Sequence, residues 1–157
     1  MNRPILILDY DGTISSYAAG WQGIDVCPDP PTEGLWRALE TYHPHFTLHV
    51  HSSRSAEEDG RFAMLEWFVD RGTEAGYRME EGMRQGLWLV TASSPADGTV
   101  RFEIFFPEHK PPAMLTLDDR AMTFTGVWPE VETLRAFQPW TRHTPPPNEG
   151  PAEEESL

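Results

Sequence analysis

The chain has 157 residues, of which 25 are acidic and 12 are basic, so its net charge is −13 with the histidines neutral. This length fits one medium-sized domain, and the 39% of hydrophobic residues excludes disorder throughout the chain. The acidity argues against a broad nucleic-acid surface, which needs clustered Lys and Arg. Eleven of the basic residues are Arg, and the remaining one is Lys110.

Two further sequence features bear on location. The apolar run at residues 5–8 is closed by Asp9 and is too short for a signal sequence or a membrane span. Cys27 is the single cysteine, so neither an intramolecular disulfide nor a multi-cysteine zinc site can form. We therefore expect a cytoplasmic protein that does not cross a membrane.

Short apolar runs alternate with helical patterns, which predicts an α/β fold. We expect a Rossmann-like three-layer sandwich with a mostly parallel central sheet that is buried on both faces. The predicted elements, in chain order, are a strand at 4–8, a helix at 32–42, a strand at 46–50, a helix that ends at Gly72, strands at 87–91, 100–106 and 114–117, and a helix that begins at Pro129.

The helix that ends at Gly72 has the clearest pattern. Ser55 is followed three residues later by Glu58, as in a capping box. Phe62, Leu65 and Val69 then form an apolar stripe, and the glycine is a typical C-terminal stop.

Two segments determine the domain organisation. The turn-forming residues 93–98 separate the strands within 87–106, so this segment is either a β-hairpin that extends the sheet or a small lid. Residues 141–157 are rich in Pro and Glu without apolar periodicity, which predicts a disordered acidic tail. The folded domain is therefore expected at residues 1–140.

Two pairs of acidic residues directly follow predicted strands. Asp9 and Asp11 come after the first strand, and Asp118 and Asp119 come after the last one. In a parallel sheet these strand ends face the ligand crevice. Residues two apart on an extended backbone point the same way, so Asp9 and Asp11 are expected to share one pocket.

A cation explains why carboxylates would gather there, because their mutual repulsion is otherwise costly. Mg²⁺ is the expected ion, since it prefers oxygen ligands. Each pair alone is more often a turn or cap motif, and the occurrence of both at strand ends favours the metal site.

Two further groups fit the same pocket. Ser52, Ser53 and Arg54 form a loop after the second strand, where hydroxyl and backbone N–H groups can hold phosphate oxygens. Arg54 can also pair with Glu57 or Glu58. Lys110 precedes two prolines and the strand that leads to the second acidic pair.

These motifs carry a resemblance. The strand followed by Asp9-Tyr10-Asp11-Gly12-Thr13 resembles the first motif of the haloacid dehalogenase (HAD) superfamily. Ser52 is similar to the second motif, Lys110 to the third, and Asp118-Asp119 to the fourth, all in the family's order. The chain also resembles small HAD-like proteins that phages and actinobacteria often encode.

The resemblance implies a Mg²⁺-dependent phosphomonoesterase. Asp9 would attack phosphorus and form an aspartyl-phosphate, while Asp11 would protonate the leaving oxygen and later activate water. The Asp9 carboxylate, the Asp11 backbone carbonyl and the Asp118/Asp119 pair would hold the metal. Ser52, Ser53, Arg54 and Lys110 would bind the phosphoryl group. The substrate would be a phosphorylated small molecule, a nucleotide or a nucleic-acid end.

The chain departs from the family pattern in two ways. Met122 and Thr123, which follow the bare Asp118-Asp119 motif, supply no further carboxylate, so which aspartate contacts the metal stays open. The gap between Thr13 and Ser52 is filled by a loop and one helix, which leaves no room for a large cap domain.

Other residues are candidates for separate roles. His43, His45, His49 and His51 occur in one segment, and the last two would share a strand face, a spacing that can bind Zn²⁺. No acid or cysteine accompanies them, which favours ordinary polar positions at a strand edge. Trp21 is a candidate for substrate stacking.

Two alternatives to the phosphatase were considered. A response-regulator receiver domain also combines acidic residues, a hydroxyl and a lysine around Mg²⁺, but its acidic residues all precede the lysine, whereas Asp118 follows Lys110. A HAD-like binding or regulatory module with little turnover is the other alternative.

Overall fold

The computed structural model describes residues 2–142, so the tail predicted at 141–157 lies almost entirely outside the described residues. Its elements are β1 (Ile5–Leu8), α1 (Leu35–Tyr42), β2 (Thr47–Val50), α2 (Glu58–Glu74), β3 (Arg78–Arg84), β4 (Leu87–Ser93), β5 (Val100–Phe106), β6 (Leu115–Leu117), α3 (Val131–Arg135) and a 3₁₀ helix (Trp140–Arg142). The protein is therefore an α/β protein, as predicted.

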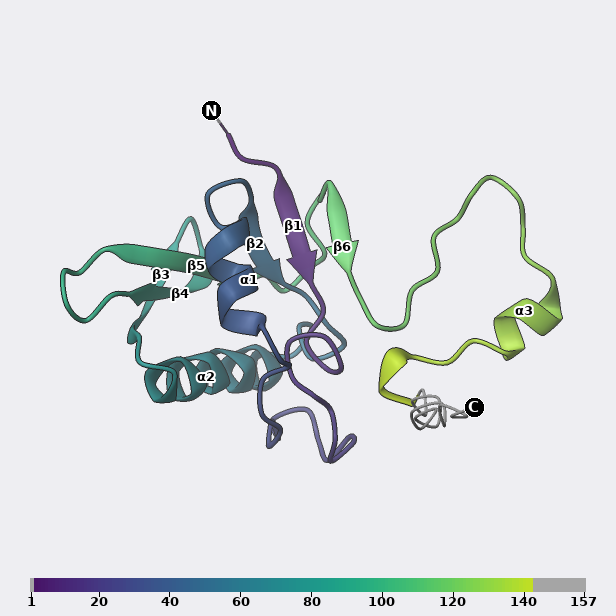
Figure 1. Ribbon diagram of the computed structural model, residues 1–157, viewed down its shortest axis with the longest axis horizontal. Coiled ribbons are helices and arrows are strands. Elements are labelled where there is room, and N and C mark those ends of the chain that lie inside the picture. The colour runs from purple at the N-terminus through teal and green to yellow at the C-terminus, as the bar shows by residue number, and fades with distance from the viewer. Residues whose placement is uncertain (1, 143–157) are drawn as a thin grey trace, which may run out of the picture.

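Six strands form one mixed sheet in the order β3-β4-β5-β2-β1-β6. The pairs β5-β2, β2-β1 and β1-β6 are parallel, so these four strands end at the same edge of the sheet (Figure 1). The pairs β3-β4 and β4-β5 are antiparallel. Residues 87–106 therefore extend the sheet and do not form a lid.

The strand β3 was missed by the sequence analysis. It is the outer strand of the sheet, and Glu81 stands between Met79 and Met83 on its apolar face, so the apolar alternation of a half-buried strand is interrupted. The turn signal is present: Gln85 has φ 53° and Gly86 has φ 78°, as in the two-residue turn that matches the twist of a hairpin.

Both longer helices pack on one face of the sheet. Trp36 of α1 stacks on Phe102 of β5, and Phe68 of α2 meets Phe106 of the same strand. The shared core contains Leu6, Leu8, Leu39, Leu48, Val50, Met64, Leu65, Phe68, Val90, Phe102, Ile104 and Phe106.

Within residues 2–142 the expected second layer of helices is not found, so two layers replace the predicted three. The opposite face of the sheet carries Ile7, His49 and Phe105, and α1 and α2 both lie on the other side. The physical reason lies in the connections. The proline-containing segment 107–114 joins β5 to β6 without a helix, and α3 buries no residue.

The start of α2 also differs from the prediction. The N-cap is Glu57 and makes no side-chain cap hydrogen bond. The Ser55 hydroxyl instead accepts a hydrogen bond from the Ser52 backbone N–H at 3.0 Å. The prediction of a capping box is therefore wrong, because Ser55 belongs to the loop that precedes the helix.

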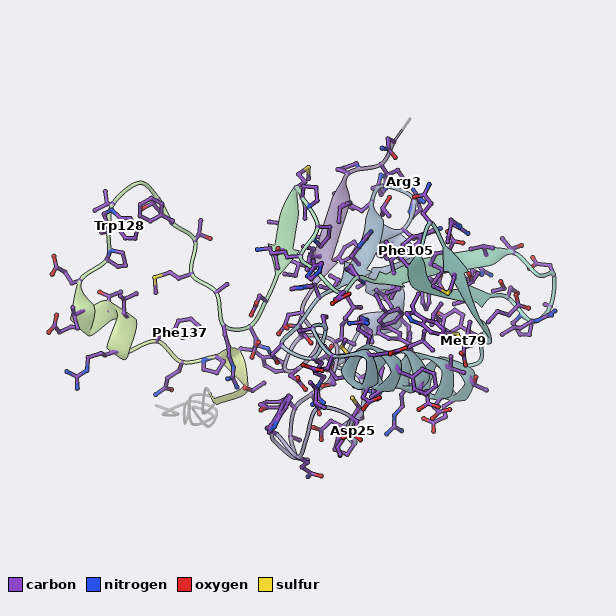
Figure 2. The ribbon with its side chains drawn as sticks, turned by 180° about the vertical axis from the view of Figure 1, so that it is seen from behind. Arg3, Asp25, Met79, Phe105, Trp128 and Phe137 are labelled. Atoms are coloured by element: carbon purple, nitrogen blue, oxygen red, sulfur yellow. The ribbon has the colours of Figure 1, made fainter. Side chains whose placement is uncertain are left out.

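Residues 120–139 form an arm that extends away from the sheet (Figure 1). Figure 2 shows Trp128 and Phe137 on this arm, far from the labelled residues of the sheet. The arm also exposes Val131 and Leu134 of α3, the short helix found where the sequence predicts one beginning at Pro129. It returns at Trp140, whose indole N–H donates a hydrogen bond of 2.7 Å to the Gly12 carbonyl.

Candidate metal and phosphate site

The first acidic residue stands where β1 ends. The Asp9 backbone N–H donates to the Leu117 carbonyl at 2.9 Å, which ties the end of β1 to the end of β6. The chain then turns sharply, because the N–H groups of Thr13, Ile14 and Ser15 all donate to the Tyr10 carbonyl. The backbone beyond Asp9 is therefore a tight turn and not an extended strand.

Three carboxylates meet at this edge. Asp9, Asp118 and Asp119 each offer one oxygen, and these oxygens all lie within 4.8 Å of one another. The Asp119 side chain is only 1% exposed, and neither of its oxygens has a hydrogen-bond partner. Arg120 Nε lies 3.7 Å from Asp119 Oδ2, which is too far for a hydrogen bond.

Gly12 makes the position of Asp119 possible. A Cβ atom on this glycine would lie 2.4 Å from Asp119 Oδ2, well inside van der Waals contact. Gly12 also has φ +83°, a left-handed conformation that side chains rarely adopt. The turn after β1 and the Asp118-Asp119 pair are thus packed directly against each other.

The carboxylate cluster is electrostatically unfavourable by itself. Burial, followed by the negative charge of Asp118, raises the pKa of Asp9 to about 8. The charged groups that act on the pKa of Asp9 are Asp118 and Asp119, and both raise it. A hard divalent cation with oxygen ligands fits such a donor set, because it would satisfy the buried oxygens of Asp119 and offset the repulsion.

Asp11 points elsewhere, so the expectation that it shares a pocket with Asp9 is wrong. Arg54 Nε donates to Asp11 Oδ2 at 2.9 Å, and Arg54 Nη2 donates to Asp11 Oδ1 at 3.0 Å. The alternation argument failed because the turn after Asp9 ends the extended backbone on which it depended. The Asp11 carboxylate is not part of the cluster around Asp9.

Arg54 is a buried structural partner of the turn after β1. Its side chain is 1% exposed, and its Nη1 donates to the carbonyls of Gly23 and Ile24, both at 2.7 Å. Its pairing with Glu57 or Glu58 is therefore not seen, and its donors are largely engaged within the protein. The Trp21 ring lies over this guanidinium, with its centroid 4.5 Å from Arg54 Cζ, and the side chain is 51% exposed, so its role in substrate stacking stays a prediction.

The serine loop follows β2, the neighbour of β1. The Ser52 hydroxyl accepts the Arg54 backbone N–H at 3.0 Å, and Ser53 is exposed. This hydrogen bond stabilises the loop at the edge of the sheet where Asp9 lies. Ser52 thus occupies the strand end that the sequence predicts for a phosphate-binding hydroxyl.

Lys110 is exposed at the end of the segment after β5. Its charge acts on His51: burial, and then Lys110, lower the pKa of that imidazole. Lys110 is not among the main influences on Asp9. The structure therefore places Lys110 at the predicted edge of the sheet but does not bring it to the carboxylates.

The four histidines do not converge. In the described part of the chain, the cluster with metal-binding geometry is the aspartate one. His43 Nδ1 accepts the Glu103 backbone N–H at 3.3 Å, and His49 stacks on Phe105. Burial lowers the pKa of His49 to about 4, so this imidazole is neutral near pH 7.

Two contacts at the site were not foreseen. The Asp11–Arg54 pair joins residues 43 positions apart, and the Trp140 contact with Gly12 spans 128 positions. For the Asp11–Arg54 pair, the sequence signal was an arginine that stands between two serines in the loop after β2. The second had no local signal, since a tryptophan beyond a long loop is usually a core residue.

No protein-family model matches the chain, and no curated protein or solved structure matches it either. Across residues 2–142 there is no helix with the length and apolar character needed to cross a membrane.

Proposed function

We propose that this protein is a Mg²⁺-dependent phosphohydrolase, a phosphomonoesterase in which Asp9 is the nucleophile. The observation that supports this most directly is the cluster of Asp9, Asp118 and Asp119 with its two buried, unpartnered oxygens on Asp119. A cluster of this kind is costly without a cation and useful with one.

The proposed metal ligands are the carboxylates of Asp9, Asp118 and Asp119. A bound Mg²⁺ would neutralise the negative charge that otherwise separates a carboxylate nucleophile from a phosphate. We propose that an Asp9 oxygen forms a bond to phosphorus as the bond to the alcohol oxygen breaks. Water then attacks this aspartyl-phosphate, which returns the Asp9 carboxylate and releases inorganic phosphate.

Ser52 and Asp11 are the other residues with proposed roles in the reaction. Ser52 follows the strand next to β1, so its hydroxyl and the backbone around it are the proposed contacts for phosphoryl oxygens. Asp11 remains the proposed general acid and base. This role requires Asp11 to leave Arg54, because the pair with that guanidinium occupies both carboxylate oxygens.

A HAD-like binding or regulatory module is the second candidate. The same Asp11–Arg54 pair favours it, because a carboxylate fixed to a buried arginine is poorly placed to exchange protons with a substrate. The exposed position of Lys110 favours it as well. In this case the cluster would bind Mg²⁺ and a phosphate group without turnover.

The test is a panel of phosphate esters, assayed for released phosphate with and without Mg²⁺. We expect native activity that requires Mg²⁺, and a loss of at least about 100-fold in Asp9→Asn. Asp25→Asn is the matched control, since Asp25 is exposed and lies outside the cluster.

Two outcomes would contradict the proposal. Activity that survives both chelation and Asp9→Asn would remove Asp9 and the metal from the reaction. A Mg²⁺-dependent rise in melting temperature, together with no turnover on any ester, would favour the binding module.

A further inference from the structure

A second cavity lies at the same edge of the sheet, away from the aspartates. Its volume is about 440 Å³, within the range of small-molecule sites, and it is lined by the start of β4, the end of β5 and the segment that leads to Lys110. Because β4 runs antiparallel to β5, Trp88 at its start pairs with Phe106 and lies at the edge where β1 ends.

The lining of this cavity is suited to an anion. Arg61 of α2 and Lys110 line it from two sides, with Glu108 as the acidic residue. Such a pairing of cations is unusual in a chain of net charge −13. Arg61 Nη1 also donates to the Ser55 carbonyl at 2.6 Å, which links the cavity to the serine loop.

The same cavity offers an aromatic surface. Trp88 lines it and is partly exposed, and Phe62 packs against Trp88 edge-on at 6.3 Å. A planar ring is the ligand group that suits this surface.

The spacing of the strands connects this cavity to the aspartates. Adjacent strands lie about 4.8 Å apart, so the ends of β1 and β5 are about 10 Å apart across β2. A nucleotide that carries a second phosphate can span this distance. One phosphate would lie at Asp9, and the second phosphate and the base would lie beside Lys110, Arg61 and Trp88.

We infer that this cavity is a binding site for the base and second phosphate of a nucleotide. Its assignment as the leaving-group site of the reaction rests on the proposed phosphohydrolase function, whereas nucleotide binding itself does not. The nucleotide can be free or can stand at the end of a strand, and the two sources share this chemistry.

Calorimetry with Asp9→Asn and adenosine 3′,5′-bisphosphate, without Mg²⁺, tests the binding. We expect Arg61→Gln and Trp88→Leu each to weaken binding by about tenfold, because one removes a cation and the other a ring. Trp88→Phe should retain most of the affinity. Arg71→Gln is the control on the same helix, since Arg71 lines a different cavity. Thermal melting shows that each variant is folded.

Unchanged affinity in both Arg61→Gln and Trp88→Leu overturns the inference, as does equally tight binding of inorganic phosphate. A short oligonucleotide with a terminal phosphate, compared with the bisphosphate, separates the two sources.

A kinetic experiment compares kcat/KM for the bisphosphate and for glycerol phosphate. If Arg61→Gln lowers both equally, the inference fails while the phosphohydrolase stands. If nothing is hydrolysed but binding follows the expected pattern, the phosphohydrolase fails and the nucleotide site stands.

Discussion

Arg54 holds both carboxylate oxygens of Asp11, with its Nε 2.9 Å from Oδ2 and its Nη2 3.0 Å from Oδ1. The Arg54 side chain is 1% exposed, so this bidentate pair is formed largely out of water. It joins the turn after β1 to the loop after β2. The pair therefore fixes the two motifs that would form the proposed active site.

Arg54→Lys should destabilise the protein by about 3–5 kcal/mol, because a lysine cannot reproduce the bidentate pair and leaves buried acceptors unpaired. Urea denaturation gives this value directly. Arg71→Lys is the control, since its pair with Glu74 is largely exposed and should contribute less than about 1 kcal/mol. Equal stabilities of Arg54→Lys and the native chain would show that the pair is not a structural one.

Asp119→Asn should stabilise the metal-free protein by about 1–2 kcal/mol. The amide removes a negative charge from the cluster and supplies a donor for a neighbouring carboxylate. The same change should remove the stabilisation that Mg²⁺ gives the native chain. Thermal melting with and without Mg²⁺ measures both effects, and Asp25→Asn should change neither. A destabilised variant with an intact Mg²⁺ response would argue against a metal site.

Gly12→Ala should disrupt the carboxylate cluster specifically. The added Cβ would displace Asp119, and the positive φ adds strain of roughly 1–2 kcal/mol. Gly20→Ala is a close match, because Gly20 has φ +70° and open space around its Cβ position. Only Gly12→Ala should reduce the Mg²⁺-dependent rise in melting temperature. Identical responses of the two variants would show that backbone strain alone explains the effect.

Trp140→Phe should cost about 1 kcal/mol, because it removes the hydrogen bond to the Gly12 carbonyl while it keeps a ring. Trp128→Phe is the control, since this side chain is 84% exposed on the arm. Denaturant unfolding compares the two. A loss of stability in Trp128→Phe as large as that in Trp140→Phe would mean that the arm contributes through contacts other than this bond.

His49→Phe should make the protein less sensitive to acid. The pKa of His49 is about 4 in the folded chain and about 6.5 when unfolded, so the unfolded state takes up the proton first. Native stability is therefore complete above about pH 6.5 and falls as the pH decreases toward 4, by about 2 kcal/mol at pH 5 from this group.

Urea unfolding at pH 7 and pH 5 tests this prediction. The difference between the two pH values should be smaller in His49→Phe than in the native chain. The exposed His45 provides the control, and His45→Phe should leave the difference unchanged. If the free energy of unfolding differs between pH 7 and pH 5 as much in His49→Phe as in the native chain, other groups cause the acid sensitivity.

The sequence alone predicted most of the elements, because their signals are local. The apolar run of β1 is continuous, and apolar residues recur at alternate positions in β2, β5 and β6. The placement of Asp9 and Asp118 at one edge followed from these strands, since parallel neighbours end together. The close approach at Gly12 is consistent with the glycine that the first motif contains.

The tertiary structure decided the features that depend on direction and on distant contacts. The turn after Asp9 sends Asp11 to Arg54 and away from the carboxylate cluster, which no alternation of residues could reveal. Both helices lie on one face because the connection after β5 contains prolines and no helix. Residue types thus predicted which groups gather at the sheet edge, whereas the path of the chain decided which of them meet, because a side chain's direction depends on the backbone that carries it.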